Sequence, residues 1–218
     1  MSLWHLLQTT DSLFPTGAFS HSGGLEGLAG EGVLKTAEDA ERAIGEILER
    51  SFATVDLPAC ALAHRAADDA DRLVEIDLAL EALKVPRELR EASRSLGRRR
   101  LKVVASLEEY RRRVEADRSP GHQAVVTGVH TALAGVPRGE ALLAFAYATA
   151  AGLAASAMKL LPLGQTRVQA LLSKLGETAP AWVAAAETMA LEDLGSFTPA
   201  LDIAAMRHET AAPRLFIS

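Results

Sequence analysis

Side chains that could pair a nucleophile with a base occur at two places in this 218-residue sequence. Ser20, His21 and Ser22 are adjacent, but neighbouring side chains on one helical turn point apart, and the motif G-x-S-x-G is absent. Cys60 and His64 are four residues apart, so one helix face could hold a thiolate and an imidazole together. A free cysteine is more often a small buried apolar residue. We therefore predict no catalytic residue, and an enzyme using one of these pairs is the alternative.

Metal-binding side chains are scattered along the chain. The six histidines, at positions 5, 21, 64, 122, 130 and 208, form neither an H-x-H nor an H-E-x-x-H motif. His208 and Glu209 could supply two ligands, whereas a structural metal site has about four. The phosphate-binding motifs G-x-G-x-x-G and G-x-x-x-x-G-K-[ST] are absent. We predict no intrinsic metal or nucleotide site, and transient surface binding of a borderline metal stays open.

The composition is that of a mildly acidic helical protein. Apolar residues make up 49% of the sequence, and alanine, leucine, glutamate and arginine dominate, which favours closely packed helices. The net charge of -5 argues against a nucleic-acid-binding protein. Cys60 is the only cysteine, so no intrachain disulfide can form. The first residues lack the basic and apolar stretches of a signal peptide, so we expect a cytoplasmic protein.

The elements that would position any site begin with the segment Asp11–Glu26, DSLFPTGAFSHSGGLE, in which turn residues alternate with large apolar ones. Pro15 and Gly17 predict a turn, because proline fixes φ and glycine admits a positive φ. One of the serines that follow can cap a helix through Leu25. Glu26 would lie in its early turns, where the helix dipole favours an anion. We expect an ordered, partly buried loop that leads into a helix.

The rest of the sequence predicts an all-α fold, a single-domain bundle of about nine or ten helices. Apolar residues recur at helical spacing between proline and glycine breaks, and no segment alternates with the period of a strand. The expected helices lie at 4–7, 20–30, from 36 to a kink near 54, from 58 to 70, 71–83, 87–107, 108–116, 122–133, 138–161, 165–175 and 180–194.

The segment Ala141–Met158 contains no charged residue over eighteen positions, which is the lower length of a membrane span. Alanine, glycine, threonine and serine make up more than half of it, so its drive to leave water is weak and we predict a buried central helix. Its small residues recur every four positions, at Ala144, Ala148, Gly152 and Ser156. This ridge indicates either a helix surrounded by its neighbours or the seam of a dimer.

The tail from Met206 to Ser218, MRHETAAPRLFIS, places charged residues beside an apolar run. Unanchored tails are usually polar. Leu215, Phe216 and Ile217 therefore suggest that this tail docks, either onto the protein's own core or onto a partner, and both alternatives stay open.

Two basic runs, Arg98–Arg100 with Lys102 and Arg111–Arg113, could contact a phosphate or an acidic protein. Several glutamates lie close to them in sequence, among them Glu88, Glu91, Glu108 and Glu109. A solvated face of mixed charge is the simpler interpretation.

The loop resembles the L-P-x-G-x-x-S-x-S-x-G-L-E signature of the UreF family of urease accessory proteins. Phe14 stands in the leucine position, and the matching residues are Pro15, Gly17, Ser20, Ser22, Gly24, Leu25 and Glu26. Further segments follow in the family's order and at similar spacing, namely Thr54–Pro58, Arg87–Glu91, Met158–Gln165, Arg207–Thr210 and Arg214–Phe216. The resemblance covers nearly the whole chain. In the tail, Ala211, Ala212 and Pro213 replace the family's usual glutamine, tyrosine and serine.

The resemblance implies a homodimeric, non-enzymatic scaffold that joins UreD (also called UreH) and recruits the GTPase UreG to deliver nickel to apo-urease. A role in regulating the GTPase is also implied. Nickel and GTP would be carried by the partners, with no intrinsic cofactor, and neither nucleic acid nor membrane is expected as a partner. Residues 1–218 would form one domain, with 206–218 a partner-docking tail. The implied partner-binding residues are Pro15, Gly17, Ser20, Ser22, Gly24, Glu26, Lys159, Gln165, Arg207, His208, Glu209, Arg214, Leu215 and Phe216. A small hydrolase and an independent nickel-binding protein are the alternatives.

Overall fold

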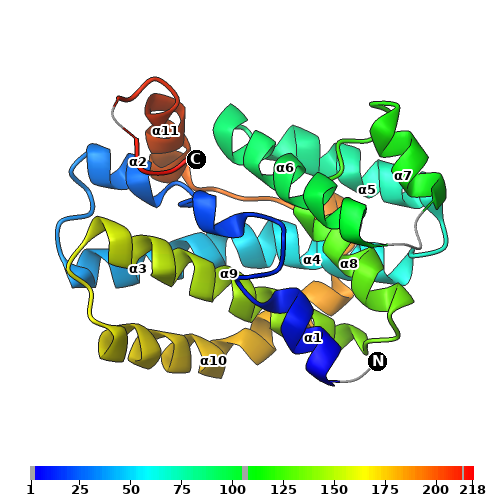
Figure 1. Cartoon of the computed structure of the whole chain (residues 1–218), viewed down its shortest axis with the longest axis horizontal. Coiled ribbons are helices and arrows are strands. Elements are labelled where there is room, and N and C mark those ends of the chain that lie inside the picture. The colour runs from blue at the N-terminus through cyan, green and yellow to red at the C-terminus, as the bar shows by residue number, and fades with distance from the viewer. Residues whose placement is uncertain (1–2, 105–107, 213) are drawn as a thin grey trace.

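The computed structural model describes residues 3–104, 108–212 and 214–218, and within these ranges it contains helices and no strand (Figure 1). The all-α prediction is confirmed. The α-helices are α1 (Leu3–Thr10), α2 (Leu25–Gly30), α3 (Ala37–Ile47), α4 (Leu57–Arg65), α5 (Ala70–Leu83), α6 (Arg87–Val103), α7 (Glu108–Glu115), α8 (Gln123–Leu133), α9 (Arg138–Leu160), α10 (Gln165–Thr188) and α11 (Pro199–His208). Two short 3₁₀-helices, Ala18–Ser20 and Leu191–Asp193, and a π-helix, Leu48–Asp56, lie between them. The predicted end of the sixth helix at Leu107 lies outside the described residues.

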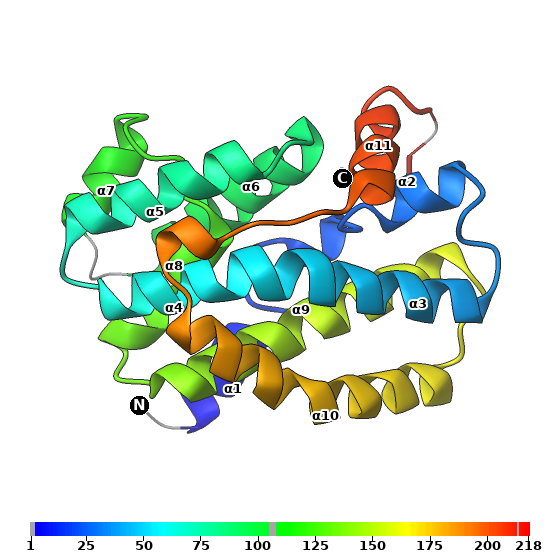
Figure 2. The same ribbon diagram turned by 180° about the vertical axis from the view of Figure 1, so that it is seen from behind.

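Helix α3 begins next to Thr36, where the sequence predicts a helix start, and the structure adds a capping box there. The Thr36 hydroxyl accepts a hydrogen bond from the Asp39 amide (3.1 Å), and the Asp39 carboxylate accepts one from the Thr36 amide (3.0 Å). At the predicted kink near Thr54 the chain instead stays helical, through the π-helix and into α4 (Figure 2). Pro58 cannot donate a hydrogen bond to the Thr54 carbonyl, and that carbonyl accepts one from the Gly195 amide (3.3 Å).

Helix α10 corrects a second prediction. The sequence indicated two helices separated before Pro180, whereas one helix runs from Gln165 to Thr188 with Pro180 in its interior. Both Pro180 and Gly176, whose carbonyl loses its helical partner, are exposed, so that carbonyl can bond to water. An extended segment then crosses to α11 (Figure 2).

Helix α11 was not predicted from the sequence, in which the last expected helix ends at residue 194. Its first residue is Pro199. An amide at the first position of a helix has no intrahelical acceptor, so proline costs the helix no hydrogen bond there. Its buried residues Leu201, Ala204 and Ala205 include two alanines, so its apolar face is too weak in sequence to stand out. The helix packs against α2.

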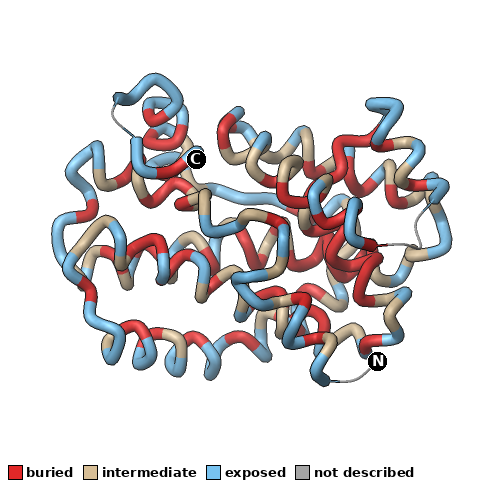
Figure 3. The backbone as a smooth tube through the Cα atoms, in the orientation of Figure 1, coloured by how far each residue is buried: buried red, intermediate tan, exposed pale blue. Residues whose placement is uncertain are grey.

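The largest buried apolar cluster takes in residues from α2 through α11, and α4 and α8 pack together most extensively (Figure 3). At their crossing Gly128 lies against the Cys60 carbonyl, where any Cβ would clash, so the two backbones can touch. Helix α9 runs through the middle of the bundle and contacts α1, α2, α3, α4, α8 and α10.

One side of α9 is not covered by neighbouring helices, and its residues Leu143 and Tyr147 are exposed. Within the described ranges, α9 is the one helix long and apolar enough to cross a membrane. Half of its apolar 18-residue stretch is buried inside the protein. Gly152 of the small-residue ridge is exposed, whereas Ser156 is buried. The dimer seam stays a prediction.

Candidate functional site

The tail folds back onto the loop, and the C-terminal segment lies beside the N-terminal loop in Figure 1. Glu26, in the first turn of α2, holds the tail by its backbone. Its carboxylate accepts hydrogen bonds from the amides of Leu215 (2.7 Å) and Phe216 (2.9 Å). Farther along, the Ile217 amide donates to the Ser20 carbonyl (2.9 Å). The tail therefore docks onto its own chain in this structure, which is the first of the two alternatives that the sequence left open.

His208, at the end of α11, lies between two carboxylates. Its Nδ1 is 2.8 Å from Glu88 Oε2 and its Nε2 is 3.0 Å from Glu26 Oε2. The contact with Glu88 is a hydrogen bond, whereas Nε2 lies close to Glu26 without forming one. Arg214 adds a bond from Nη1 to Glu88 Oε1 (3.0 Å). The basic side chains of His208 and Arg214 thus lie against two nearly buried carboxylates.

Glu88 corrects the sequence interpretation. It was assigned to a solvated face of mixed charge, but its side chain is buried and it bonds to tail residues about 120 positions away. The sequence carried no signal for this pairing. The two carboxylates lie on opposite sides of the His208 ring, so they cannot share one metal ion with it. Across the described residues, no group of three or more His, Cys, Asp or Glu side chains is arranged to hold a metal.

Glycines let the loop and α11 approach each other. A Cβ on Gly27 would lie 2.6 Å from the Ala204 carbonyl oxygen, so only glycine allows α2 and α11 to pack at this distance. Gly24 has φ 91°, which favours glycine, and it lies against the side chain of Leu201. Helix α2 begins at Leu25 and not near residue 20, and the Ser22 hydroxyl accepts a hydrogen bond from the Glu26 amide (3.2 Å) in its first turn.

The first half of the loop is held by α6. Arg99 donates to the Thr16 carbonyl (3.2 Å), beside the turn at Pro15 and Gly17. Arg100 donates to the Thr9 carbonyl (3.0 Å), and its guanidinium lies 4.7 Å from the centre of the Phe14 ring. Arg100 is buried, and burial lowers its pKa to about 10. One consequence is that this arginine is not available to a phosphate.

The other basic residues also pair mainly within the chain. Arg98 binds Asp117 (2.9 Å), Arg112 binds Glu109 (2.7 Å), and Arg113 binds both Asp71 (2.6 Å) and Glu109 (3.2 Å). The Arg111 guanidinium donates to the Leu101 carbonyl (2.9 Å). The mixed-charge face predicted around these runs is present, with the exception of Glu88.

Lys159 joins the end of α9 to this site. Its ammonium donates to the Phe19 carbonyl (3.3 Å) and lies 5.0 Å from the centre of the buried Phe216 ring. Gln165 is different, because it begins α10, which starts well away from the C-terminus in both views (Figures 1 and 2). The structure therefore separates these two predicted partner-binding residues.

The remaining predicted residues fall into two groups. Ser22, Gly24, Glu26, His208 and Phe216 face inward and hold the tail on the loop. Arg207, in the last turn of α11, pairs with Glu31, and Glu209, directly after the helix, pairs with Arg87. The other members of the site were not predicted from the sequence; they are Glu88, Ser218, Ser156 and Phe19. Ser218 Oγ lies 2.7 Å from His21 Nδ1. The Ser156 hydroxyl donates to the His21 carbonyl (3.2 Å).

Neither pair considered for catalysis is assembled. Cys60 is fully buried, and burial raises the pKa of its thiol to about 12. His64 Nε2 lies 2.9 Å from the Val136 carbonyl and does not contact Cys60 through that nitrogen. His21 faces Ser218, whereas the Ser22 hydroxyl is bonded to the Glu26 amide.

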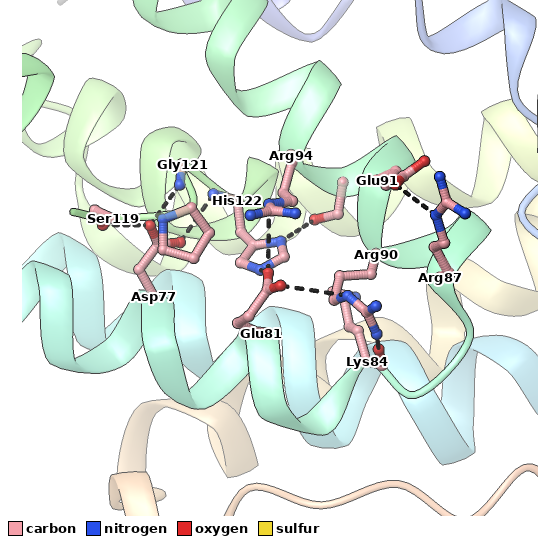
Figure 4. Close-up of polar contacts among 12 residues, drawn as sticks. Asp77, Glu81, Lys84, Arg87, Arg90, Glu91, Arg94, Ser119, Gly121 and His122 are labelled. Atoms are coloured by element: carbon pink, nitrogen blue, oxygen red, sulfur yellow. Dashed lines mark hydrogen bonds and ion pairs between the residues drawn. The ribbon is translucent and has the colours of Figure 1, made fainter. Parts of the chain in front are cut away.

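A Ser–His–Glu arrangement does occur elsewhere, around His122 (Figure 4). His122 Nδ1 lies 3.1 Å from Ser93 Oγ, and its Nε2 lies 3.0 Å from Glu81 Oε2. Burial, together with Lys84, Arg94, Arg90 and Arg98, lowers the pKa of His122 to about 3, so the ring is too weak a base to activate a hydroxyl. Its role is structural.

Asp77 completes this network and fixes the turn before α8 (Figure 4). Its carboxylate accepts hydrogen bonds from the Tyr110 hydroxyl (2.9 Å), the Ser119 hydroxyl (2.5 Å) and the amides of Gly121 (2.5 Å) and His122 (2.8 Å). Burial raises the pKa of this carboxyl, while the four donors counteract that rise. The network is a fully bonded buried polar cluster and offers no open position for a substrate.

Comparison with known proteins agrees with the resemblance seen in the loop. The family model for UreF matches residues 34–176. The chain belongs to the UreF family. It is 35% identical to the urease accessory protein UreF of Arthrobacter sp. (strain FB24), over 98% of this chain and 96% of that protein. The UreF proteins of Kocuria rhizophila and Bacillus sp. (strain TB-90) are 35% and 33% identical, over 98% and 99% of this chain and 95% and 99% of those proteins.

Membership of the UreF family decides between an accessory protein and an enzyme. UreF relatives are named as urease accessory proteins, so the chain is an accessory protein of urease maturation and not an enzyme. The UreF match covers residues 34–176, and the full-length relatives extend it to the loop and the tail. The loop–tail site is therefore the candidate functional site of this UreF chain.

Proposed function

We propose that this chain is the scaffold on which nickel is delivered to apo-urease. It joins UreD/UreH and recruits the GTPase UreG, with nickel and GTP carried by these partners. It works as a cytoplasmic homodimer in which residues 1–218 act as one domain, and it regulates GTP hydrolysis by UreG. The resemblance of the loop and tail to the UreF signature supports this proposal.

The observation that carries the proposal is that Glu26 binds the backbone of the tail. Two amide hydrogen bonds and the contact with His208 converge on one carboxylate whose side chain is 12% exposed. Loop and tail, which are almost 190 residues apart in sequence, thus form a single ordered surface. An ordered surface loses little conformational freedom on binding, which suits a scaffold that contacts other proteins.

Co-purification tests the proposal directly. The chain should form a complex with UreD/UreH at micromolar concentration, and the complex should capture UreG in the presence of nickel and GTP. Light scattering of the free chain should give twice the 23.1 kDa chain mass. A folded chain, by circular dichroism, that binds neither protein at micromolar concentration would contradict the scaffold function.

Regulation of the GTPase is tested separately. The rate of phosphate release by UreG should differ with and without the complex, at fixed UreG and nickel concentrations. An unchanged rate would remove the regulatory part of the proposal and leave the scaffold part standing.

A further inference from the structure

Arg100 is a buried cation that has no carboxylate partner in the part of the chain that the structure describes. Its side chain, in α6, is 6% exposed, and its Nε makes no hydrogen bond. The guanidinium instead donates to the Thr9 carbonyl (3.0 Å), lies 3.2 Å from His130 Nδ1 and covers the Phe14 ring at 4.7 Å. A buried charge without a counter-ion is unfavourable, so these three neutral partners are what stabilises it.

His130, on α8, can make this contact only as a neutral ring. A guanidinium only donates hydrogen bonds, so His130 Nδ1 has to accept, and the ring carries its proton on Nε2. The Phe14 ring stacks on the His130 ring with 6.3 Å between the ring centres. A second proton, on Nδ1, would replace the hydrogen bond from Arg100 by two cations in contact.

The groups that act on His130 oppose a positive charge on its ring. Burial, together with Arg100 from α6 and His5 from α1, lowers the pKa of His130 to about 4. From α4, Cys60 acts on Arg100, but burial raises the pKa of the Cys60 thiol to about 12, so this thiol supplies no negative charge.

Acidic side chains on the neighbouring elements are used elsewhere and do not offset a charge on His130. Asp11 accepts a hydrogen bond from the amide two residues farther on (2.7 Å). Asp77 and Glu81, on α5, bind the turn and the histidine that precede α8. On α9, Arg138 pairs with a glutamate of α10 (3.0 Å). A proton on His130 therefore has no anion to receive it.

The segment that this contact holds is only weakly packed otherwise. We call Leu3–Phe14, which comprises α1 and the start of the loop, the N-terminal arm. Helix α1 lies on the outside of the bundle against α9 (Figure 1) and buries only Leu6 and Thr9. Leu6 packs with Val136 and Ala141 in a small apolar cluster separate from the main core. An element with so few buried contacts opens at a lower free-energy cost than the core does.

We propose that the N-terminal arm is released by acid, and that His130 is the residue whose protonation releases it. A proton on His130 breaks the hydrogen bond from Arg100, and α1 and Phe14 leave the bundle while the core stays folded. The docked arm excludes this proton and the released arm admits it. Release therefore increases as the pH falls.

Release changes the molecule at two places. Phe14 belongs to the signature loop, and Arg99 still holds the Thr16 carbonyl (3.2 Å), so only the start of the loop moves. The arm also forms one wall of an apolar cavity of about 720 Å³ between α1, α9 and α10, with Leu6 and Leu7 among its lining residues. One protonation therefore alters both the loop and this cavity.

Hydrogen exchange of the α1 amides at pH 7.5 and 5.0, expressed as protection factors at each pH, measures the release. A free helix of eight residues is too short to persist, so released amides exchange quickly. Protection of α1 should fall by about 5- to 30-fold from pH 7.5 to pH 5.0 relative to α4. The upper value applies if His130 returns to its ordinary pKa of 6.5 in the released state.

Two variants identify the residue that takes the proton. His130→Asn keeps an acceptor near the position of Nδ1 but cannot be protonated, so its α1 protection should change less than about twofold between the two pH values. The matched control is His122→Gln, which removes another buried histidine that does not contact the arm. The control should keep the wild-type response of α1. In the wild type, histidine NMR should show His130 titrating with the same midpoint as the loss of α1 protection, which tests the proposal even if the Asn variant does not fold.

The other outcomes overturn the proposal. Constant α1 protection in the wild type would show that the arm is not released. An equal fall in α1 and α4 would show unfolding of the whole chain. A fall in His130→Asn as large as in the wild type, or a His130 titration at a different midpoint, would show that another group takes the proton.

Discussion

His122 should make the stability of this fold sensitive to acid. The ring is completely buried and lies among four cationic side chains, Lys84, Arg94, Arg90 and Arg98. These surroundings lower its pKa from 6.5 to about 3, so it is neutral in the folded protein. Between these two values the unfolded chain binds a proton that the folded chain does not. Stability is therefore fully present above pH 6.5 and is lost as the pH falls toward 3.

The size of the effect follows from the gap in pKa. At pH 5.0 the solution is 1.5 pH units below 6.5, the pKa in the unfolded chain, and each unit is worth about 1.4 kcal/mol, so His122 should cost about 2 kcal/mol relative to pH 7.5. His130 contributes similarly, because burial lowers its pKa to about 4. A variant is needed to separate them. His122→Gln removes the titration and can still donate to Glu81.

Urea unfolding followed by circular dichroism at pH 7.5 and 5.0, at one protein concentration, measures the difference. His122→Gln should lose about 1–3 kcal/mol at pH 7.5 from weakened hydrogen bonds. Its further loss on going to pH 5.0 should be about 2 kcal/mol smaller than that of the wild type. The His130→Gln variant should show a similar reduction. If His122→Gln instead falls as steeply as the wild type, then His122 is protonated in the folded protein and forms an ion pair with Glu81, and the reasoning is wrong.

Four further predictions concern the site and the core. Glu26→Gln should speed trypsin cleavage at Arg214, because the tail loses a charged acceptor, whereas Glu31→Gln, which breaks only an exposed pair with Arg207, should leave cleavage unchanged. Gly27→Ala should cost about 1–3 kcal/mol by pushing α11 away, whereas Gly30→Ala, which meets open space in the same helix, should cost nothing, and equal urea midpoints would refute this. Cys60 should resist iodoacetamide at pH 8 in the native protein and react in urea, because its pKa is about 12; native labelling would show that it is not buried. Equilibrium dialysis at micromolar nickel should find less than one ion per dimer, and a stoichiometric site would favour the independent nickel-binding alternative.

The sequence predicted the helical class and most helix positions because these depend on local signals. The helix start at Thr36 and the breaks at Pro86, Pro137 and Pro162 are signals that act on residues only a few positions away. The failures occurred where a distant group changed the local outcome. Thr54 stays within a helix of π geometry, and its carbonyl accepts a hydrogen bond from Gly195, a partner that no local pattern announces.

The site likewise combines features that local sequence predicts with contacts that only the folded chain creates. The motif located the loop and the tail, and it included Glu26 and His208, but it did not show that these two residues bind each other. Glu88 was missed because a glutamate on a helix rich in arginine is usually solvated, and only the returning tail buries it. Pairing across about 120 residues is a property of the fold.

The polar residues of a signature are commonly taken as the contact surface of an accessory protein, but the geometry here separates assembly from contact. Glu26 and His208 hold the tail, so changing them would disturb the loop–tail surface even if neither residue touches a partner. The side chains of Phe19 and Ile217 are largely exposed, so they contribute little to the packing of the fold. A loss of binding at Glu26 therefore cannot locate the interface, whereas a loss at Phe19 with a docked tail can. The exposed apolar residues are the informative positions to mutate.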